Sequence, residues 1–168
     1  MAVQRDGVGQ IFVATFTNID ISAAQDLFEI VAPTNSRIVI REFELGQQSD
    51  AGDALADMLG LLFIKGHTVT GSGGASVTPV NMAPWSDLAA GATVKRNNTT
   101  IASGGTPLTL RATAWNVMGG YRYYPGFRNE RITLNYSERL AIRLPDAPGS
   151  TITCNATLVF EEIAAMGG

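Results

Sequence analysis

The sequence of 168 residues has few of the residues on which metal centres, disulfide frameworks and many active sites are built. It contains one histidine, His67, and one cysteine, Cys154. A single cysteine cannot close an intrachain disulfide, and one histidine with one cysteine does not supply the three or four ligands that zinc needs. We therefore expect neither a metal nor a cofactor. Because free cysteine is among the most often buried residue types, we interpret Cys154 as a small core residue.

Charged residues are scarce as well, and long apolar runs are lacking. Only 16% of the residues are charged, the net charge is −3, and both signs are interleaved along the chain. No basic patch for direct binding of nucleic acid stands out from this pattern. No run approaches the roughly 18 apolar residues of a membrane-spanning helix, and the N-terminus has no apolar segment of signal-peptide length. We expect a protein made in a cytoplasm that crosses no membrane and does not bind nucleic acid directly.

His67 lies in a glycine-rich segment, residues 66–74, that fits neither of two common catalytic or nucleotide-binding patterns. A nucleophile elbow, Gly-x-Ser-x-Gly, needs glycine two residues before the serine, but Thr70 holds that position relative to Ser72. A phosphate loop ends in Gly-Lys-Ser/Thr, whereas Lys65 precedes the glycines. A glycosidase would need two carboxylates facing a cleft, and no such pair is recognisable among the 15 acidic residues. We predict a structural His67 and a protein that is not an enzyme.

The sequence is rich in short β-forming runs separated by turn residues, a pattern typical of a sandwich or barrel. About ten strands are expected, at residues 11–17, 27–31, 37–45, 58–65, 76–80, 92–100, 108–118, 131–135, 139–144 and 151–161. In the third run, strict alternation places Val39, Arg41, Phe43 and Leu45 on one face, and Ile38, Ile40, Glu42 and Glu44 on the other. In the last run, alternation predicts a buried face made of Ile152, Cys154, Ala156, Leu158 and Phe160.

The predicted fold is all-β, a two-sheet antiparallel β-sandwich of jelly-roll type with one or two short helical turns in loops. A plain sandwich also fits this number of strands. The helical turns are expected at residues 49–57 and 84–89. We expect one β-sandwich domain over residues 11–162, a flexible N-terminal arm at 1–10 and a flexible C-terminal tail at 163–168.

Aromatic residues and arginines form the most function-like feature of the sequence, because protein interfaces favour both. The candidate interface residues are Trp85, Trp115, Tyr121, Arg122, Tyr123, Tyr124, Phe127 and Arg128. The stretch 121–128 has three possible roles: contact with a neighbouring subunit, stacking against sugar rings in a glycan site, or packing within its own fold. We favour the subunit contact, which predicts a homo-oligomer, either a homo-dimer or a homo-trimer.

Several short blocks carry a resemblance to a known class of protein. They are Gly66-His67-Thr68 with Gly71-Ser72-Gly73-Gly74, Arg96-Asn97-Asn98-Thr99-Thr100, Ala114-Trp115-Asn116 and Leu158-Val159-Phe160-Glu161. In these blocks the sequence resembles the capsid decoration, or cement, proteins of tailed bacteriophages. The resemblance implies a jelly-roll-like sandwich, assembly as dimers or trimers, and the major capsid protein as a partner on the outer surface of an icosahedral virion.

The function implied by this resemblance is that of a non-enzymatic virion structural protein, which binds the outside of the capsid and stabilises it. The alternative is a carbohydrate- or receptor-binding module of a phage head or tail fibre. An enzyme that acts on cell-surface glycan is the third hypothesis.

Overall fold

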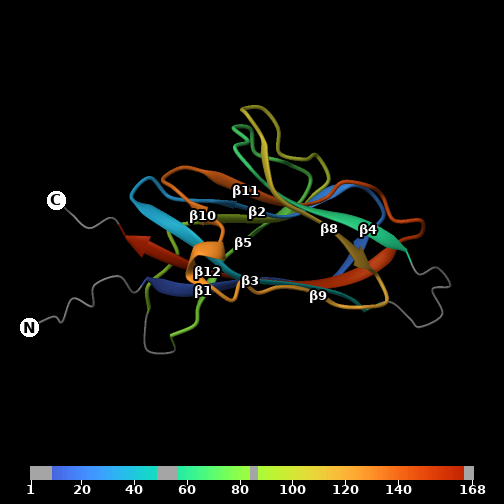
Figure 1. The fold of residues 1–168 in the computed structure, drawn as a ribbon, viewed down its shortest axis with the longest axis horizontal. Helices are drawn as coiled ribbons and strands as arrows, with labels where there is room; N and C mark the ends of the chain where they lie inside the picture. Colours follow the sequence, from blue (N-terminus) through green and yellow to red (C-terminus); the bar gives the residue numbers. More distant parts are fainter. Residues whose placement is uncertain (1–8, 49–56, 84–86, 165–168) are drawn as a thin grey trace, which may run out of the picture.

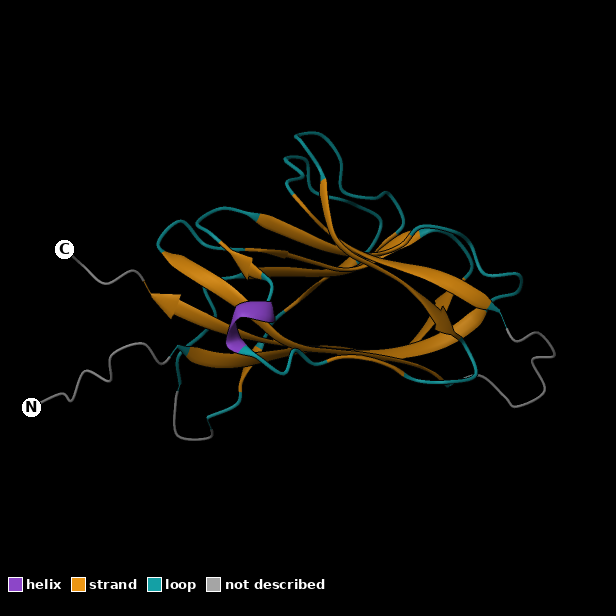
Figure 2. Ribbon diagram, viewed as in Figure 1, coloured by secondary structure: helices purple, strands orange, loops and turns teal. Residues whose placement is uncertain are grey.

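The computed structural model describes residues 9–48, 57–83 and 87–164, which form two antiparallel β-sheets packed face to face (Figure 1). Strands and loops make up almost all of the described chain, with one short 3-10 helix, Arg128–Glu130 (Figure 2). The predicted all-β antiparallel sandwich is therefore confirmed. No helix in these ranges is long and apolar enough to cross a membrane.

Each sheet has six strands. In sheet A the order is β10-β3-β12-β1-β6, and β9 also pairs with β3. Its strands are β1 (Gln10–Ile21), β3 (Ser36–Gln47), β6 (Val80–Asn81), β9 (Tyr121–Tyr123), β10 (Thr133–Leu134) and β12 (Ile152–Ala164). In sheet B the order is β5-β7-β2-β11-β4-β8. Its strands are β2 (Gln25–Val31), β4 (Met58–Lys65), β5 (Ala75–Val77), β7 (Thr93–Asn98), β8 (Leu108–Asn116) and β11 (Arg139–Leu144).

The core between the sheets is built around phenylalanines from both of them. Phe43 of sheet A meets Phe28 and Phe63 of sheet B edge to face, with ring centroids 6.3 and 5.7 Å apart. Such edge-to-face pairs add to the stabilisation that comes from burial alone. The alternation predicted for the last strand is confirmed. Its buried apolar residues are Ile152, Cys154, Ala156, Leu158 and Phe160. Burial raises the pKa of the Cys154 thiol to about 12, in keeping with a core residue.

The face assignment predicted for residues 37–45 is wrong, because a β-bulge interrupts the alternation. Ile38 and Ile40 are buried, and so are Phe43 and Leu45. The partner strand moves directly from Phe160, opposite Ile40, to Val159, opposite Glu42. Arg41 is the extra residue, and it shifts the inward-facing set by one position.

The first strand extends beyond its predicted end at residue 17, since β1 continues to Ile21. The pairing of β1 with β12 shifts between Phe16 and Ile19, and Asn18 takes the left-handed conformation with a φ of 53°. Asparagine tolerates that conformation better than most residues, so the irregularity bends β1 without ending it.

Other predicted elements also differ from the structure. The run at 76–80 divides between the sheets, with β5 in sheet B and β6 in sheet A, and β9 was not predicted as a strand. Of the helical turns predicted at 49–57 and 84–89, residues 49–56 and 84–86 lie outside the described residues, and Asp57 and residues 87–89 are not helical. Paired strands extend from Gln10 to Ala164, while residues 1–8 and 165–168 lie outside the described ranges.

Candidate interaction sites

Two glycine-rich loops rise together from the outer face of sheet B (Figure 1). We call residues 66–74 and 99–107 the loop platform. Two isolated antiparallel bridges join the loops, one between Val69 and Ser103 and one between Ser72 and Thr100. Each bridge carries two backbone hydrogen bonds of 2.9–3.0 Å. The two loops therefore support one another as a small extra ribbon above the sheet.

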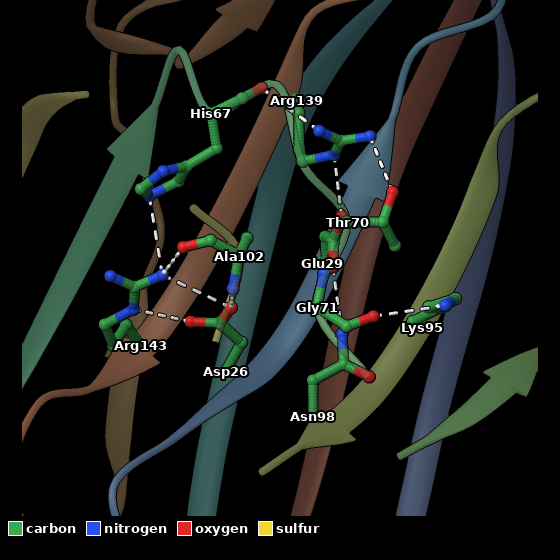
Figure 3. A network of polar contacts seen from close by, with 10 residues as sticks. All are labelled: Asp26, Glu29, His67, Thr70, Gly71, Lys95, Asn98, Ala102, Arg139 and Arg143. Atoms are coloured by element: carbon green, nitrogen blue, oxygen red, sulfur yellow. Dashed lines mark hydrogen bonds and ion pairs between the residues drawn. The ribbon is translucent and has the colours of Figure 1, made fainter. Parts of the chain in front are cut away.

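One buried ion pair anchors the second loop to the sheet (Figure 3). Arg143 on β11 donates from Nε to Oδ1 of Asp26 on β2 at 2.6 Å, and from Nη2 to Oδ2 at 3.3 Å. The backbone of Ala102 completes the arrangement, since its N–H donates to Asp26 Oδ2 at 2.6 Å and its carbonyl accepts from Arg143 Nη2 at 2.8 Å. Because Asp26 is fully buried, these bonds replace the water that its carboxylate would otherwise bind.

A second ion pair anchors the first loop in a similar way. Glu29 on β2 lies 2.7 Å from Arg139 on β11, measured from Oε1 to Nε. Its other oxygen, Oε2, accepts hydrogen bonds from the Gly71 N–H and from Asn98 Nδ2, both at 2.9 Å. Arg139 also donates to the carbonyl of His67 and to Oγ1 of Thr70. Burial raises the pKa of the Glu29 carboxyl, while the Gly71 N–H and the Arg139 charge oppose that change.

His67 packs against the first of these ion pairs. Its Nε2 lies 3.4 Å from Nη2 of Arg143, and the side chain is buried. Burial lowers the pKa of the imidazole, and the positive charge of Arg143 lowers it further. The ring is therefore held in its neutral form, in which Nε2 can accept a hydrogen bond from the guanidinium. This arrangement gives His67 a structural part in the network.

None of the four ion-pair residues was singled out from the sequence. Asp26 and Glu29 are the charged residues of β2, and Arg139 and Arg143 are those of β11, two strands whose other residues are nearly all buried. The available signal was opposite charges inside two runs that are otherwise buried, because such charges are nearly always paired. The sequence could not reveal that β2 and β11 are neighbours.

The platform exposes apolar as well as polar side chains to solvent. Val69 is 55% exposed and Ile101 is 39% exposed, whereas His67 and Ala102 are buried. Singly exposed apolar residues are ordinary on a protein surface. Here they are presented by loops that buried ion pairs hold in place, which reduces the entropy that a partner would have to remove on binding.

The second candidate site is the aromatic segment, residues 121–128, with its neighbours. The structure separates the predicted interface residues into buried and exposed ones. Tyr123 packs its ring against Phe63 with centroids 5.2 Å apart, and its hydroxyl accepts from the Ile132 N–H and donates to the Glu130 carbonyl. Trp115 is also buried and donates from Nε1 to the Gly119 carbonyl. These two rings pack within the chain, so little of their surface remains for a partner.

The remaining interface candidates lie closer to solvent. Tyr124 and Phe127 are 66% and 69% exposed, and Arg128 is exposed. Arg122 is exposed too, pairs with Glu42, and places its guanidinium 5.0 Å from the centre of the Tyr124 ring. Tyr121 is half-buried, and its hydroxyl accepts from Arg111 Nε at 3.2 Å. Trp85 lies outside the described residues.

A surface pocket of about 470 Å³ lies beside this segment. Arg111, Arg122, Tyr124 and Glu130 contribute to its walls. The guanidinium of Arg111 also faces the ring of Tyr123, 5.4 Å from its centre. The pocket thus combines two cationic side chains with one exposed aromatic ring.

In chemical terms, the two sites present exposed apolar, aromatic and cationic side chains. No three or more His, Cys, Asp or Glu side chains within the described ranges are grouped as metal ligands. Fold and sites together define an antiparallel β-sandwich with a braced loop platform. No protein-family model, curated protein or solved structure matches this chain.

Proposed function

We propose that this chain is a non-enzymatic virion structural protein that binds the outside of an icosahedral phage capsid and stabilises it. The observation that supports this most strongly is the order of strand pairing. A jelly roll is a long antiparallel hairpin of eight strands rolled into two sheets, so its first strand pairs with its last, its second with its seventh, and so on inward. Viral capsid domains are among the proteins that use this fold.

Eight strands of this chain pair in that order once β5, β6, β7 and β10 are set aside. The pairs are β1 with β12, β2 with β11, β3 with β9, and β4 with β8. The strands set aside follow β4 and β9 as additions within the connections. We therefore assign the chain to the jelly-roll type, which agrees with the fold that the resemblance to decoration proteins implies.

Two surfaces are available for the major capsid protein. The loop platform presents Val69 and Ile101 from a base held by buried ion pairs, and the aromatic segment presents Tyr124 and Phe127. A surface fixed before binding loses little conformational freedom on contact, and exposed aromatic rings are frequent anchors of interfaces. Repetition of the contact over a symmetric shell would then strengthen weak individual contacts through effective concentration.

The test is the stability of phage particles with and without the protein. Particles that lack it should assemble but rupture at a lower temperature, because a protein that binds only the assembled lattice stabilises that lattice by mass action. Adding back the purified chain should restore the rupture temperature. Equal rupture temperatures, or protein found only on tails, would overturn the proposal.

Variants identify the surface that makes the contact. Tyr124→Ala and Phe127→Ala should each lower the occupancy of capsid sites, by roughly 30-fold in affinity if the ring is an anchor that contributes about 2 kcal/mol. Tyr136→Ala is the matched control, because Tyr136 is a partly exposed aromatic residue outside the segment. Equal occupancy for all three variants would exclude the aromatic segment and leave the loop platform as the contact surface.

A second candidate function is a carbohydrate- or receptor-binding fibre module. The pocket beside Tyr124 favours it, because an exposed ring next to Arg111 and Arg122 can stack on a sugar and pair with an acidic substituent. Direct binding of the purified chain to host-cell polysaccharide, abolished by Tyr124→Ala, would support this function.

A further inference from the structure

The edges of the two sheets differ sharply in how much backbone they leave open. Sheet A ends in β6 on one side and in β9 and β10 on the other, which have two or three residues each. Sheet B ends in β5, with three residues, and in β8, with nine. Short edge strands are one of the means by which proteins prevent their sheets from pairing with other chains. Among the described strands, β8 lacks this protection.

Side chains do not protect β8 either. Its sequence, Leu-Thr-Leu-Arg-Ala-Thr-Ala-Trp-Asn, contains no proline or lysine and a single charge, Arg111. That charge is engaged within its own chain, since Arg111 Nε donates to the Tyr121 hydroxyl and the guanidinium faces the Tyr123 ring. On its inner side β8 pairs with β4 from Met58 to Lys65, with one bulge at Leu110, and no described strand pairs with its outer side. The bulge leaves the regular stretch from Arg111 to Asn116 as the open edge.

From these observations we propose that β8 is an interface at which two copies of this chain pair, antiparallel, into one continuous sheet. A two-fold axis at Thr113 would place Ala112 opposite Ala114 of the second copy. Small side chains would then face one another across the outer surface, where both alanines are exposed. Arg111 would lie opposite Trp115 of the second copy, so the two arginines are not brought into direct opposition.

The second copy fits this edge better than a different protein would. An antiparallel pair of identical strands is isologous, so every contact away from the axis is made twice and the open backbone groups of both copies are satisfied together. The single charge lies off the axis, and the residues at the axis are uncharged. Pairing through β8 does not depend on the proposed capsid function, and it makes the homo-oligomer a dimer.

Light scattering on the purified chain gives the first test. The expected mass is twice 17.8 kDa at micromolar concentration. Ala112→Lys combined with Ala114→Lys should convert the dimer into a monomer, because each new lysine would face another directly across the axis. Ala75→Lys with Ala89→Lys is the matched control, since both are exposed alanines outside β8 and the charge change is the same. That control should remain dimeric.

A second test measures the register of the two β8 strands, and it does not depend on the folding of the lysine variant. Ala112→Cys mixed with Ala114→Cys should form a disulfide between copies on mild oxidation, whereas each variant alone should do so far less. Directly opposite positions lie within disulfide reach, while positions 112 and 112 of the two copies would be diagonal neighbours about 7–8 Å apart. A monomeric or trimeric wild type, a lysine variant that stays dimeric, or no preference for the mixed disulfide would overturn the proposal.

Discussion

Asp26 and Glu29 are three residues apart on β2, yet both carboxylates lie on the outer face of sheet B, each paired with an arginine of β11 (Figure 3). A β-bulge makes this possible, because the pairing passes from Phe28, opposite Ile142, directly to Asp26, opposite Arg143. The extra residue, Leu27, packs into the core instead. One irregularity in one strand thus aligns two ion pairs beneath two loops, and the shape of the platform depends on it.

The pair of Asp26 with Arg143 should be costly to break. Asp26→Asn removes the negative charge and leaves a buried guanidinium without its counter-ion, so we expect a loss of about 3–5 kcal/mol in the free energy of unfolding. Urea titration measures this loss. The control is Glu44→Gln, which weakens an exposed contact with Arg122 and should cost under about 1 kcal/mol. Similar losses for the two variants would mean that the buried pair does not brace the fold.

His67 should make stability depend on pH. Its pKa is lowered from 6.5 by burial and by Arg143, so the unfolded chain binds this proton more readily than the folded chain. Stability contributed by the neutral ring is therefore present above about pH 6.5, and it is lost as the pH falls through that value toward the lower folded-state pKa. His67→Gln removes this titration, so the variant should lose less stability between pH 7 and pH 5 than the wild type.

Glu29 acts in the opposite direction in this experiment. Its pKa is raised from 4.5, so the folded chain binds that proton more readily and acidification through the raised value favours the folded state. Because wild type and His67→Gln share Glu29, the difference between their pH profiles isolates the histidine. Parallel profiles from pH 7 to pH 5 would contradict the assignment.

The positions of the strands could be predicted from the sequence better than the sheet face on which each side chain lies. The limits expected for β4 and β11, residues 58–65 and 139–144, agree with those observed because turn residues flank two strongly apolar runs. The predicted division of β3 into two faces was wrong, because Ile38 and Ile40 share the buried face with Phe43 and Leu45. The bulge inserts Arg41 without any turn residue that would reveal it in the sequence. A strict alternation of faces therefore still fits the residues on either side of Arg41.

The candidate sites were less predictable, because they depend on contacts between distant segments. Asp26 meets Arg143 across 117 positions of the chain, and Gly71 meets Glu29 across 42. Sequence reasoning found the aromatic segment through its composition, but composition does not tell which of two adjacent tyrosines points inward. Pairing of β9 with β3 decides this, since it places Tyr123 opposite Phe43, within the core.

Gly66 should be intolerant of a side chain. Its φ of +94° lies in the region that glycine favours, and a Cβ there would lie 2.3 Å from the Thr106 carbonyl oxygen. Gly66→Ala should therefore cost about 2 kcal/mol or more and loosen the joint between the two platform loops. Gly126→Ala is the control, because a Cβ there meets nothing within 4 Å. Amide hydrogen exchange at Val69 and Ser103 would report the loosening, and unchanged exchange in Gly66→Ala would contradict it.

Tyr123 and Tyr124 are neighbours in the sequence with opposite environments, 4% and 66% exposed. Tyr123→Ala removes a ring that packs against Phe63 and leaves the Ile132 N–H without its acceptor, so we expect a loss of about 3–5 kcal/mol. In a domain of this size that corresponds to a fall in melting temperature of roughly 10 °C.

Tyr124→Ala should change stability by less than about 0.5 kcal/mol, because its ring lies at the surface beside Arg122. Thermal unfolding of both variants therefore decides which tyrosine can be substituted to test binding. If Tyr123→Ala unfolded at the same temperature as Tyr124→Ala, the placement of Tyr123 in the core would be wrong and both rings would again be candidates for the interface.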